Sequence, residues 1–352
     1  MVTIHPYSSV HNQSLEMVQI MSVKKVILST FAVLTGMSTT HSAQAQALVK
    51  LDGSSTVYPI MEAVSEEFQK STKGRIKSTI GISGTGGGFK KFCRGETDIS
   101  NASRPILKKE MEDCAAAGIK YIELPIAFDA LTVVVNPKNT FIKQLTVAQL
   151  KMMWDPASSG KITTWKQIDP TWPDAPFRLF GPGADSGTFD YFTEAIVGKA
   201  KSSRADFTAS EDDNVLVQGV SRDINGLGYF GFAYYTENQS KLRAVPIVNK
   251  QGLAVSPAEV AVIAGTYNPL ARPIFIYVSE KALARPEVKE YLDFTMKNAA
   301  KLSKEVKYVP LPAKAYEINL EHIKKNKIGT VFKGGSETGV TIDELLKREA
   351  AL

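Results

Sequence analysis

Short apolar runs alternate along the chain with segments in which apolar residues recur at helical spacing. Residues 48–51 and 76–82 have the character of buried strands, and after the first of them apolar residues recur four positions apart from Ile60 to Phe68. A third strand is expected at 98–102. Strands that alternate with helices predict an α/β fold with a mostly parallel sheet, in which ligands bind near the carboxyl ends of the strands.

The later part of the chain predicts further strands and a helical end. Strands are expected at 131–135, 177–180, 226–235 and 274–278, and helices at 189–196, 286–302, 313–327 and after the capping box that begins at Thr341. The run GLGYFG at 226–231 has the spacing of a dinucleotide-binding fingerprint. The apolar residues after it continue the strand pattern instead of opening a helix, so we interpret it as strand and turn. A second lobe inserted between two halves of the first fits this order.

The first segment has the features of a secretory signal peptide. Lys24 and Lys25 precede an apolar stretch at 26–37, and small residues follow as far as Ala47. The apolar stretch is shorter than the roughly 20 residues of a membrane span. Cleavage after Ala45 or after Ala47 fits this pattern, and neither position is followed by a cysteine. We therefore expect residues 1–47 to be removed from a periplasmic protein that has no lipid anchor.

Composition narrows the possible chemistry. The formal net charge is +6, and no basic run is interleaved with aromatic residues, so a nucleic-acid partner is not expected. Without the leader, His322 is the only histidine. Nucleophilic catalysis with a histidine base and a histidine-ligated metal site therefore lack their residues, and we expect no enzymatic activity, no cofactor and no metal. The two cysteines, Cys93 and Cys114, are expected to form a disulfide in an oxidising compartment.

Three clusters rich in Ser, Thr and Gly lie where helices are predicted to begin. They are DGSSTVYP at 52–59, GISGTGGGF at 81–89 and GPGADSGTF at 181–189. Backbone N–H groups and hydroxyls at the positive end of a helix dipole are suited to holding an oxyanion. One such cluster alone is more often a capped turn, but three of them suggest one anion held from several sides. Arg104, after the third strand, adds a bidentate donor.

Acidic residues at 211–214 precede another apolar stretch. Their spacing does not match a calcium loop, and a helix cap is the stronger interpretation. Asp213 or Asn214 at the end of this run is also in a position to reach a ligand.

The three clusters, together with TDISNASRPI, DALTVVVNP and RPIFIYV, resemble the periplasmic phosphate-binding proteins that deliver to the phosphate-specific ABC importer. The likeness extends from about Leu48 to beyond Lys301. It implies a two-lobed type II periplasmic binding protein, with a mostly parallel sheet flanked by helices in each lobe and hinge strands between them. We expect lobe 1 to comprise 48–134 and 248–352, and lobe 2 to comprise 135–247.

The resemblance also implies ligand contacts. It places Ser54, Ser55, Thr56, Ser83, Ser186, Gly187 and Thr188 at positions that contact the ligand, and the clusters and charge arguments add Val57, Gly84, Thr85, Arg104, Asp185, Asp213 and Asn214. The chain departs from the family pattern at Arg104, where well-studied members carry Asp, and at Pro182, where they carry Arg. Because phosphate keeps a proton near neutral pH and sulfate has none, rejection of sulfate requires a buried acceptor. Asp185 and Asp213 are the candidates.

We therefore predict a monomeric receptor that binds inorganic phosphate and delivers it to an ABC importer permease. Three alternatives stay open at this point. The chain could be a receptor for another oxyanion such as sulfate, a secreted phosphatase or other hydrolase, or a surface or adhesion protein on the same fold. Release of phosphate from a model ester would identify the hydrolase, and absence of tight anion binding would favour the adhesion protein.

Overall fold

The structure is a computed structural model that describes residues 47–335 and 337–352. The predicted leader therefore lies outside the described residues, apart from Ala47, with which the first strand begins. Within the described residues, no helix combines the length and the apolar character that crossing a membrane requires.

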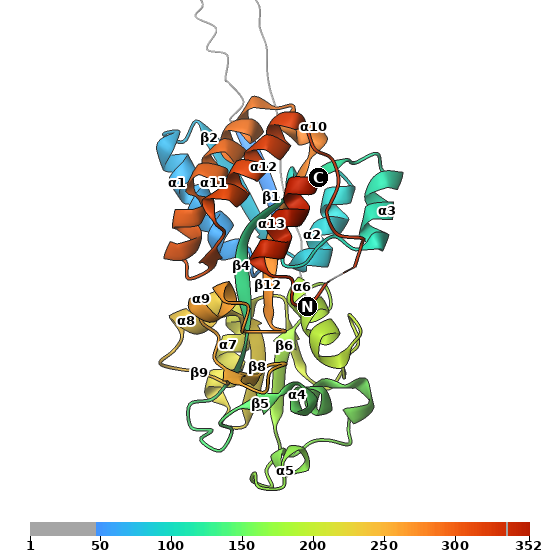
Figure 1. Cartoon of the computed structure of the whole chain (residues 1–352), viewed down its shortest axis with the longest axis vertical. Coiled ribbons are helices and arrows are strands. Elements are labelled where there is room, and N and C mark those ends of the chain that lie inside the picture. The colour runs from blue at the N-terminus through green and yellow to red at the C-terminus, as the bar shows by residue number, and fades with distance from the viewer. Residues whose placement is uncertain (1–46, 336) are drawn as a thin grey trace, which may run out of the picture. The chain divides into compact units, whose positions relative to one another are not determined.

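Two parallel sets of strands are joined by two long antiparallel strands. The strand order is β2-β1-β3-β12-β4-β8-β6-β7, and β9 and β13 also pair with β4. The first parallel set is β1 (Ala47–Gly53), β2 (Ile76–Ile82) and β3 (Ile99–Ala102), and the second is β6 (Arg178–Pro182), β7 (Thr208–Ser210) and β8 (Gly226–Gly231). Between them, β4 (Tyr121–Val135) and β12 (Ala271–Ser279) run antiparallel. Figure 1 shows β4 passing from the region of the first set into that of the second.

Helices flank both parallel sets. Those around the first set and at the C-terminal end are α1 (Tyr58–Ser71), α2 (Gly84–Cys93), α3 (Lys108–Ala116), α10 (Glu280–Leu283), α11 (Pro286–Glu305), α12 (Ala313–Lys325) and α13 (Ile342–Ala351). The others are α4 (Val147–Trp154), α5 (Trp165–Ile168), α6 (Gly187–Phe192) with a π-helical turn at Thr193–Val197, α7 (Asp213–Arg222), α8 (Phe232–Glu237) and α9 (Glu259–Ile263). The remaining short elements are β5 (Leu145–Thr146), β9 (Arg243–Ala244), β10 (Ile247–Val248), β11 (Ala254–Val255), β13 (Val309–Pro310) and a 3-10 turn at Pro156–Ser158.

Strand β4 is longer than the sequence pattern predicted, and all of its residues are buried. The sequence indicated only 131–135, because Glu123, Pro125 and Asp129 break the apolar run before it. Glu123 is satisfied in the core, where Thr330 donates to it at 2.6 Å. Pro125 lies beside a register irregularity between β4 and β12, which is where a strand tolerates a residue without an N–H.

The strand predicted at 226–235 is wrong in its second half, because α8 begins at Phe232. A carboxylate from β4 explains the change: Asp129 Oδ1 accepts a hydrogen bond from the Phe232 N–H at 3.2 Å. The glycines of GLGYFG lie within the buried strand β8 and not in a loop after it. At Gly228, a Cβ would lie 2.8 Å from Val220 Cγ2, so this glycine permits close packing of α7 on the sheet.

The Cys93–Cys114 disulfide predicted from the sequence is confirmed, and it joins α2 to α3 across a separation of 21 residues. We expect the Cys93→Ala/Cys114→Ala variant to be less stable to unfolding by about 3 kcal/mol, because the bond limits the entropy of the unfolded chain. Urea denaturation of the oxidised protein and of the variant measures the difference. Equal midpoints would show that the bond adds no stability.

Candidate functional site

Each of the three clusters lies at the end of a strand. The first follows β1, where Gly53 has φ +139° and a Cβ would lie 2.2 Å from the Asn101 carbonyl oxygen, so the turn requires glycine. The second follows β2, and Gly84 opens α2 with φ +72°. The third follows β6, and the Ser186 hydroxyl caps α6 by accepting from the Thr188 N–H at 3.1 Å.

The structure brings all three clusters together. The hydroxyls of Thr56 and Thr188 lie 2.9 Å apart and are buried. The Gly86 N–H donates to the Asp185 carbonyl at 2.7 Å. A Cβ on Gly187 would lie 2.4 Å from Thr85 Oγ1. The clusters therefore form one dense group of hydroxyls and helix N-termini, whose first N–H groups have no partner within their own helices.

Arg272 provides a buried cation at this group. Its Nη2 donates to Thr188 Oγ1 at 2.7 Å, and its Nη1 donates to the Gly187 carbonyl at 3.0 Å. Its neighbour across the β12–β4 pairing is Asp129, with an Nη2–Oδ2 distance of 3.0 Å. The guanidinium also lies over the Tyr191 ring, 5.4 Å from its centroid. The sequence analysis did not select Arg272, although it opens the RPIFIYV block.

Asp213 adds a buried carboxyl beside this cation. It is the first residue of α7, whose N-cap is Asp212, the acceptor for the Asn214 N–H at 2.9 Å. Asp213 is fully buried, and neither carboxyl oxygen has a hydrogen-bond partner within residues 47–335 and 337–352. The pKa of Asp213 is raised to about 8, mainly by burial and also by the charge of Asp129, while the charge of Arg272 opposes the rise. The two predictions for 211–214 have different outcomes. Asp212 caps the helix, and Asp213 is buried within electrostatic range of Asp129 and Arg272.

Two tyrosines fix the backbone of the first cluster from outside it. Tyr234 donates to the Ser55 carbonyl at 2.9 Å, and Tyr308 donates to the Thr56 carbonyl. Both hydroxyls are thereby directed at carbonyls, which leaves the Thr56 hydroxyl to face Thr188.

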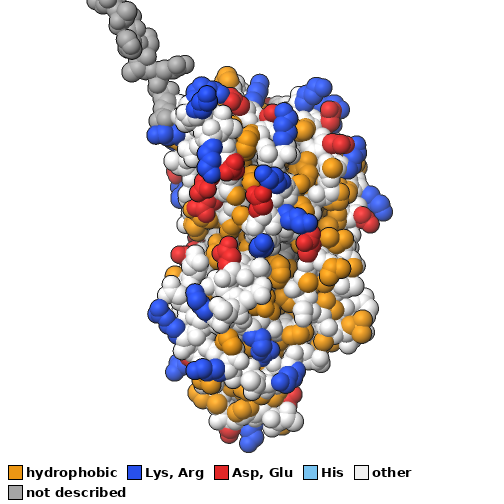
Figure 2. All heavy atoms as spheres, turned by 90° about the vertical axis from the view of Figure 1, so that its left-hand side faces the viewer, with side chains coloured by type: hydrophobic (Ala, Val, Ile, Leu, Met, Phe, Trp, Pro, Cys, Tyr) orange, Lys and Arg blue, Asp and Glu red, His pale blue; other side chains and the backbone are white. Residues whose placement is uncertain are grey.

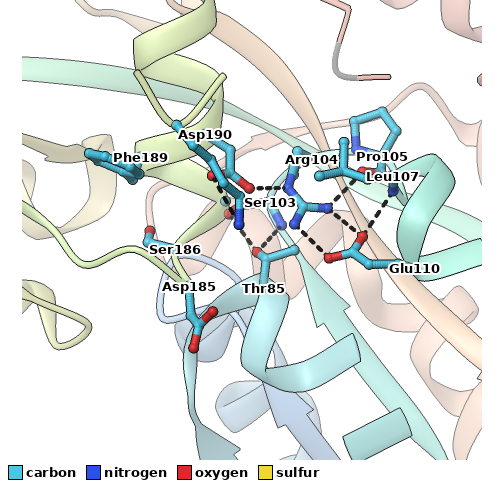
Figure 3. A network of polar contacts seen from close by, with 12 residues as sticks. Thr85, Ser103, Arg104, Pro105, Leu107, Glu110, Asp185, Ser186, Phe189 and Asp190 are labelled. Atoms are coloured by element: carbon cyan, nitrogen blue, oxygen red, sulfur yellow. Dashed lines mark hydrogen bonds and ion pairs between the residues drawn. The ribbon is translucent and has the colours of Figure 1, made fainter. Parts of the chain in front are cut away.

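Four of the predicted ligand residues are engaged or exposed elsewhere. The Ser83 hydroxyl donates to Asp52. The Asp185 side chain is 39% exposed and pairs with Lys90 at 2.8 Å. Asn214 is exposed. Arg104 is fully buried. Its Nε donates to Asp190 at 2.7 Å, and its Nη1 and Nη2 donate to Glu110 at 2.8 Å each (Figure 3).

Comparisons with known proteins place this geometry in a family. The PBP superfamily domain matches residues 38–299. Protein SphX of Synechococcus elongatus is 55% identical over 325 residues, covering 92% of this chain and 96% of SphX. Phosphate-binding protein PstS of Staphylococcus saprophyticus is 40% identical over 276 residues, covering 78% of this chain and 84% of PstS. The chain belongs to this PstS and SphX family of the PBP superfamily.

Solved structures agree with the assignment. A possible phosphate binding protein from Planctomyces limnophilus is 47% identical with a TM-score of 0.59, over 80% of this chain and 99% of that one. A putative phosphate ABC transporter substrate-binding protein with bound phosphate, from Clostridium perfringens, is 26% identical with a TM-score of 0.64, over 75% of this chain and 100% of that one. The family and the two-lobed α/β fold predicted from the sequence are confirmed.

Metal chemistry has no visible site in this PstS and SphX family member. Among residues 47–335 and 337–352, no group of three or more His, Cys, Asp or Glu side chains is placed to hold a metal ion. The candidate site is a set of hydrogen-bond donors with one guanidinium and two carboxyls, an arrangement that is suited to holding an anion.

Proposed function

We propose that this protein binds inorganic phosphate where the three clusters meet and delivers it to the membrane permease of an ABC importer. The observation that carries the proposal is the buried contact of Arg272 with Thr188, which in turn faces Thr56. The printed names of PstS and of the phosphate-bound Clostridium perfringens structure support the same ligand.

Local hydrogen-bond donors, and not net charge, hold the ion in this proposal. Arg272 is balanced by Asp129, so the site has little excess positive charge to attract an anion. Figure 2 shows Lys and Arg side chains interspersed with Asp and Glu over the upper part of one face, which gives that area no broad field of one sign. Hydroxyls and helix N–H groups that are fixed in advance replace the water shell of the ion at little cost in reorganisation.

Asp213 is the acceptor that we propose for the proton of phosphate. It is buried near Arg272, and its carboxyl oxygens have no hydrogen-bond partner among the residues that the structure describes, whereas Asp185 is part-exposed and pairs with Lys90. An ionised, buried carboxylate accepts a P–OH group but repels the bare oxygens of sulfate. Selection of phosphate over sulfate then depends on the protonation of Asp213.

The proposed contact set follows from these positions. It consists of Ser54, Ser55, Thr56 and Val57, the helix start at Gly84 and Thr85, the third cluster at Ser186, Gly187 and Thr188, and Arg272 and Asp213. Ser83, Arg104, Asp185 and Asn214 are left out because of their other contacts or their exposure. The proposed lobes remain 48–134 with 248–352, and 135–247, so that β4 crosses between them.

Export by the signal peptide and residence in the periplasm without a lipid anchor complete the proposal. PstS-like receptors act outside the cytoplasmic membrane, and the disulfide agrees with an oxidising compartment. Cell fractionation followed by N-terminal sequencing tests this part, with a start near Gln46 or Leu48 expected.

Calorimetric titration of the purified protein with phosphate and with sulfate tests the function. Above about pH 8, where Asp213 is ionised, we expect tight binding of phosphate and weaker binding of sulfate, with no release of phosphate from a model ester. Equal binding of both ions would leave a general oxyanion receptor. Absence of binding by either ion would contradict the proposal and favour a role in contacting macromolecules.

Replacing Thr188 by Val should weaken phosphate binding by about 1.5–3 kcal/mol, the contribution of one hydrogen bond to a charged group. Valine keeps the shape of the side chain and removes the hydroxyl that meets Thr56 and Arg272. Thr295→Val is the matched control, because Thr295 is equally buried in α11 and donates only to the Tyr291 carbonyl. Calorimetry on both variants measures the effect. Unchanged affinity in Thr188→Val would show that the third cluster is structural.

A further inference from the structure

An ion pair joins the two parallel strand sets beside the proposed site. Arg104 follows β3 of the first set, and Asp190 belongs to α6, which follows β6 of the second set. Their Nε–Oδ2 distance is 2.7 Å, and both side chains are 0% exposed. Figure 3 shows Arg104 and Asp190 pointing toward each other, one from the part of the chain that carries the first strand set and the other from the part that carries the second.

Arg104 is held rigidly on its own side of this boundary. Glu110 accepts from its Nη1 and Nη2, and the Pro105 carbonyl accepts from Nη1 at 3.0 Å. Glu110 is itself fixed, because it accepts from the Leu107 N–H at 2.9 Å. The guanidinium also lies 5.8 Å from the centroid of the Phe89 ring. All of these partners belong to the part of the chain that carries the first set. They therefore orient the arginine independently of Asp190.

The carboxyl of Asp190 depends on Arg104 for its hydrogen bond. Its Oδ2 accepts from Arg104. Its Oδ1 accepts no hydrogen bond from the part of the chain that the structure describes, and Lys201 Nζ lies 3.9 Å from this oxygen. Burial raises the pKa of Asp190 and the charge of Arg104 opposes this rise. A separation of the two sets would return both groups to water and break the pair.

The Arg104–Asp190 pair is close in sequence to the proposed ligand contacts. Asp190 is two residues after Thr188, and its N–H donates to the Ser186 carbonyl at 3.1 Å. The N–H of Ser103, next to Arg104, donates to Thr85 Oγ1 at 3.1 Å. Fixing Asp190 against Arg104 therefore fixes the third cluster against the second.

We infer that Arg104 and Asp190 form a latch that holds the two parts of the protein closed around the ligand, with Glu110 as its anchor. This inference rests on the proposed function and replaces a direct contact between Arg104 and phosphate. Hinge closure around a ligand is the usual motion of periplasmic binding proteins. A contact made only after closure affects the rate of ligand release more than the rate of encounter. Arg104 and Asp190 are thus positioning residues that set how long the ion is retained.

Stopped-flow kinetics of phosphate binding on Asp190→Asn, Arg104→Met and the double variant test the latch. We expect each single change to raise koff at least tenfold and to leave kon within threefold. The koff of the double variant should not exceed the higher of the two single-variant values, because the two residues act as one unit. Asp185→Asn is the control: its pair with Lys90 also joins the two sets but is exposed, so koff should change less than threefold.

Small-angle scattering with and without phosphate measures the overall dimensions of the protein, which a local packing defect would not change. The variants should stay more extended than the wild type at saturating phosphate, while selectivity for phosphate over sulfate stays unchanged. Because Arg104→Met leaves the buried carboxyl of Asp190 and the part-buried carboxyl of Glu110 without their partner, Arg104→Met/Glu110→Gln/Asp190→Asn is the variant to use if the single one does not fold.

Three outcomes would overturn the latch. The first is loss of phosphate binding in Arg104→Met with normal binding in Asp190→Asn, which would indicate that Arg104 contacts the ligand directly. The second is an effect on koff in the double variant that equals the sum of the two single effects. The third is an unchanged koff in the single variants. A wild type that does not bind phosphate would defeat the proposed function instead. In that case the coupling of Arg104 and Asp190 in urea unfolding, measured without ligand, still tests the pair.

Discussion

Replacing Arg272 by methionine together with Asp129 by asparagine should reduce phosphate affinity by at least a hundredfold. Arg272 is the buried cation that reaches Thr188 and Gly187. In the proposed site it donates to phosphate, and each hydrogen bond to a charged group contributes about 1.5–3 kcal/mol. The double replacement is needed because methionine alone would leave the buried Asp129 unpaired, which costs about 3–5 kcal/mol of folding free energy. Calorimetric titration with phosphate measures the loss.

Arg204→Met/Asp206→Asn is the matched control for this experiment. Arg204 is also buried and pairs with an aspartate, with an Nε–Oδ1 distance of 2.6 Å, but its other contacts are the carbonyls of Met153 and Ile162. This variant should bind phosphate like the wild type. If the Arg272 variant keeps an affinity within tenfold of the wild type while remaining folded, the cation of the site lies elsewhere.

The N-terminal part of the fold could be predicted because its signals are local. Strand β2 has the predicted bounds, and α1 and α2 begin next to the Ser/Thr/Gly clusters. The later errors have distant causes. α8 begins at Phe232 because Asp129, 103 residues away, accepts its N–H. The first part of β4 is a strand because Glu123 finds Thr330, 207 residues away, and no local pattern reports such a partner.

The candidate site shows the same division. The clusters could be predicted because Ser, Thr and Gly residues at the start of a helix are a local signal. The sequence did not indicate which arginine lies beside them. Arg104 lies close to the clusters in sequence, yet its donors are taken by Glu110 and by Asp190, 86 residues away. Arg272 reaches the third cluster only because β12 pairs with β4 in the observed register. Choosing between them required the long-range pairing of strands.

Sulfate binding should fall with pH above about 8, and phosphate binding should not. The raised pKa of Asp213, to about 8, means that the free protein holds a proton on this carboxyl below that pH and loses it above. Sulfate needs the protonated, donating form. Its affinity should therefore drop about tenfold for each pH unit above 8, because each unit of pH changes the protonation free energy by 1.36 kcal/mol. The phosphate dianion brings its own proton, which the ionised Asp213 accepts.

Asp213→Asn should remove this discrimination. An amide offers a donor to sulfate and an acceptor to phosphate at every pH, so the sulfate curve should become flat and the two affinities should approach each other. Asp185→Asn is the control, because its carboxyl is part-exposed and pairs with Lys90, and it should keep the wild-type curves. Titrations with both ions from pH 6 to about pH 9.5 provide the measurement.

Stability gives a test of Asp213 that needs no ligand. Its folded-state pKa is about 8, against an ordinary value of 3.8 for an aspartate, so between these values the folded protein holds a proton that the unfolded chain lacks. This group therefore makes the protein less stable as pH rises from about 4 to about 8, with no further loss above. Asp213→Asn should remove that slope in urea unfolding. A wild-type sulfate affinity that is independent of pH, together with an unchanged slope in the variant, would show that Asp213 is not the acceptor and that phosphate is selected by other groups.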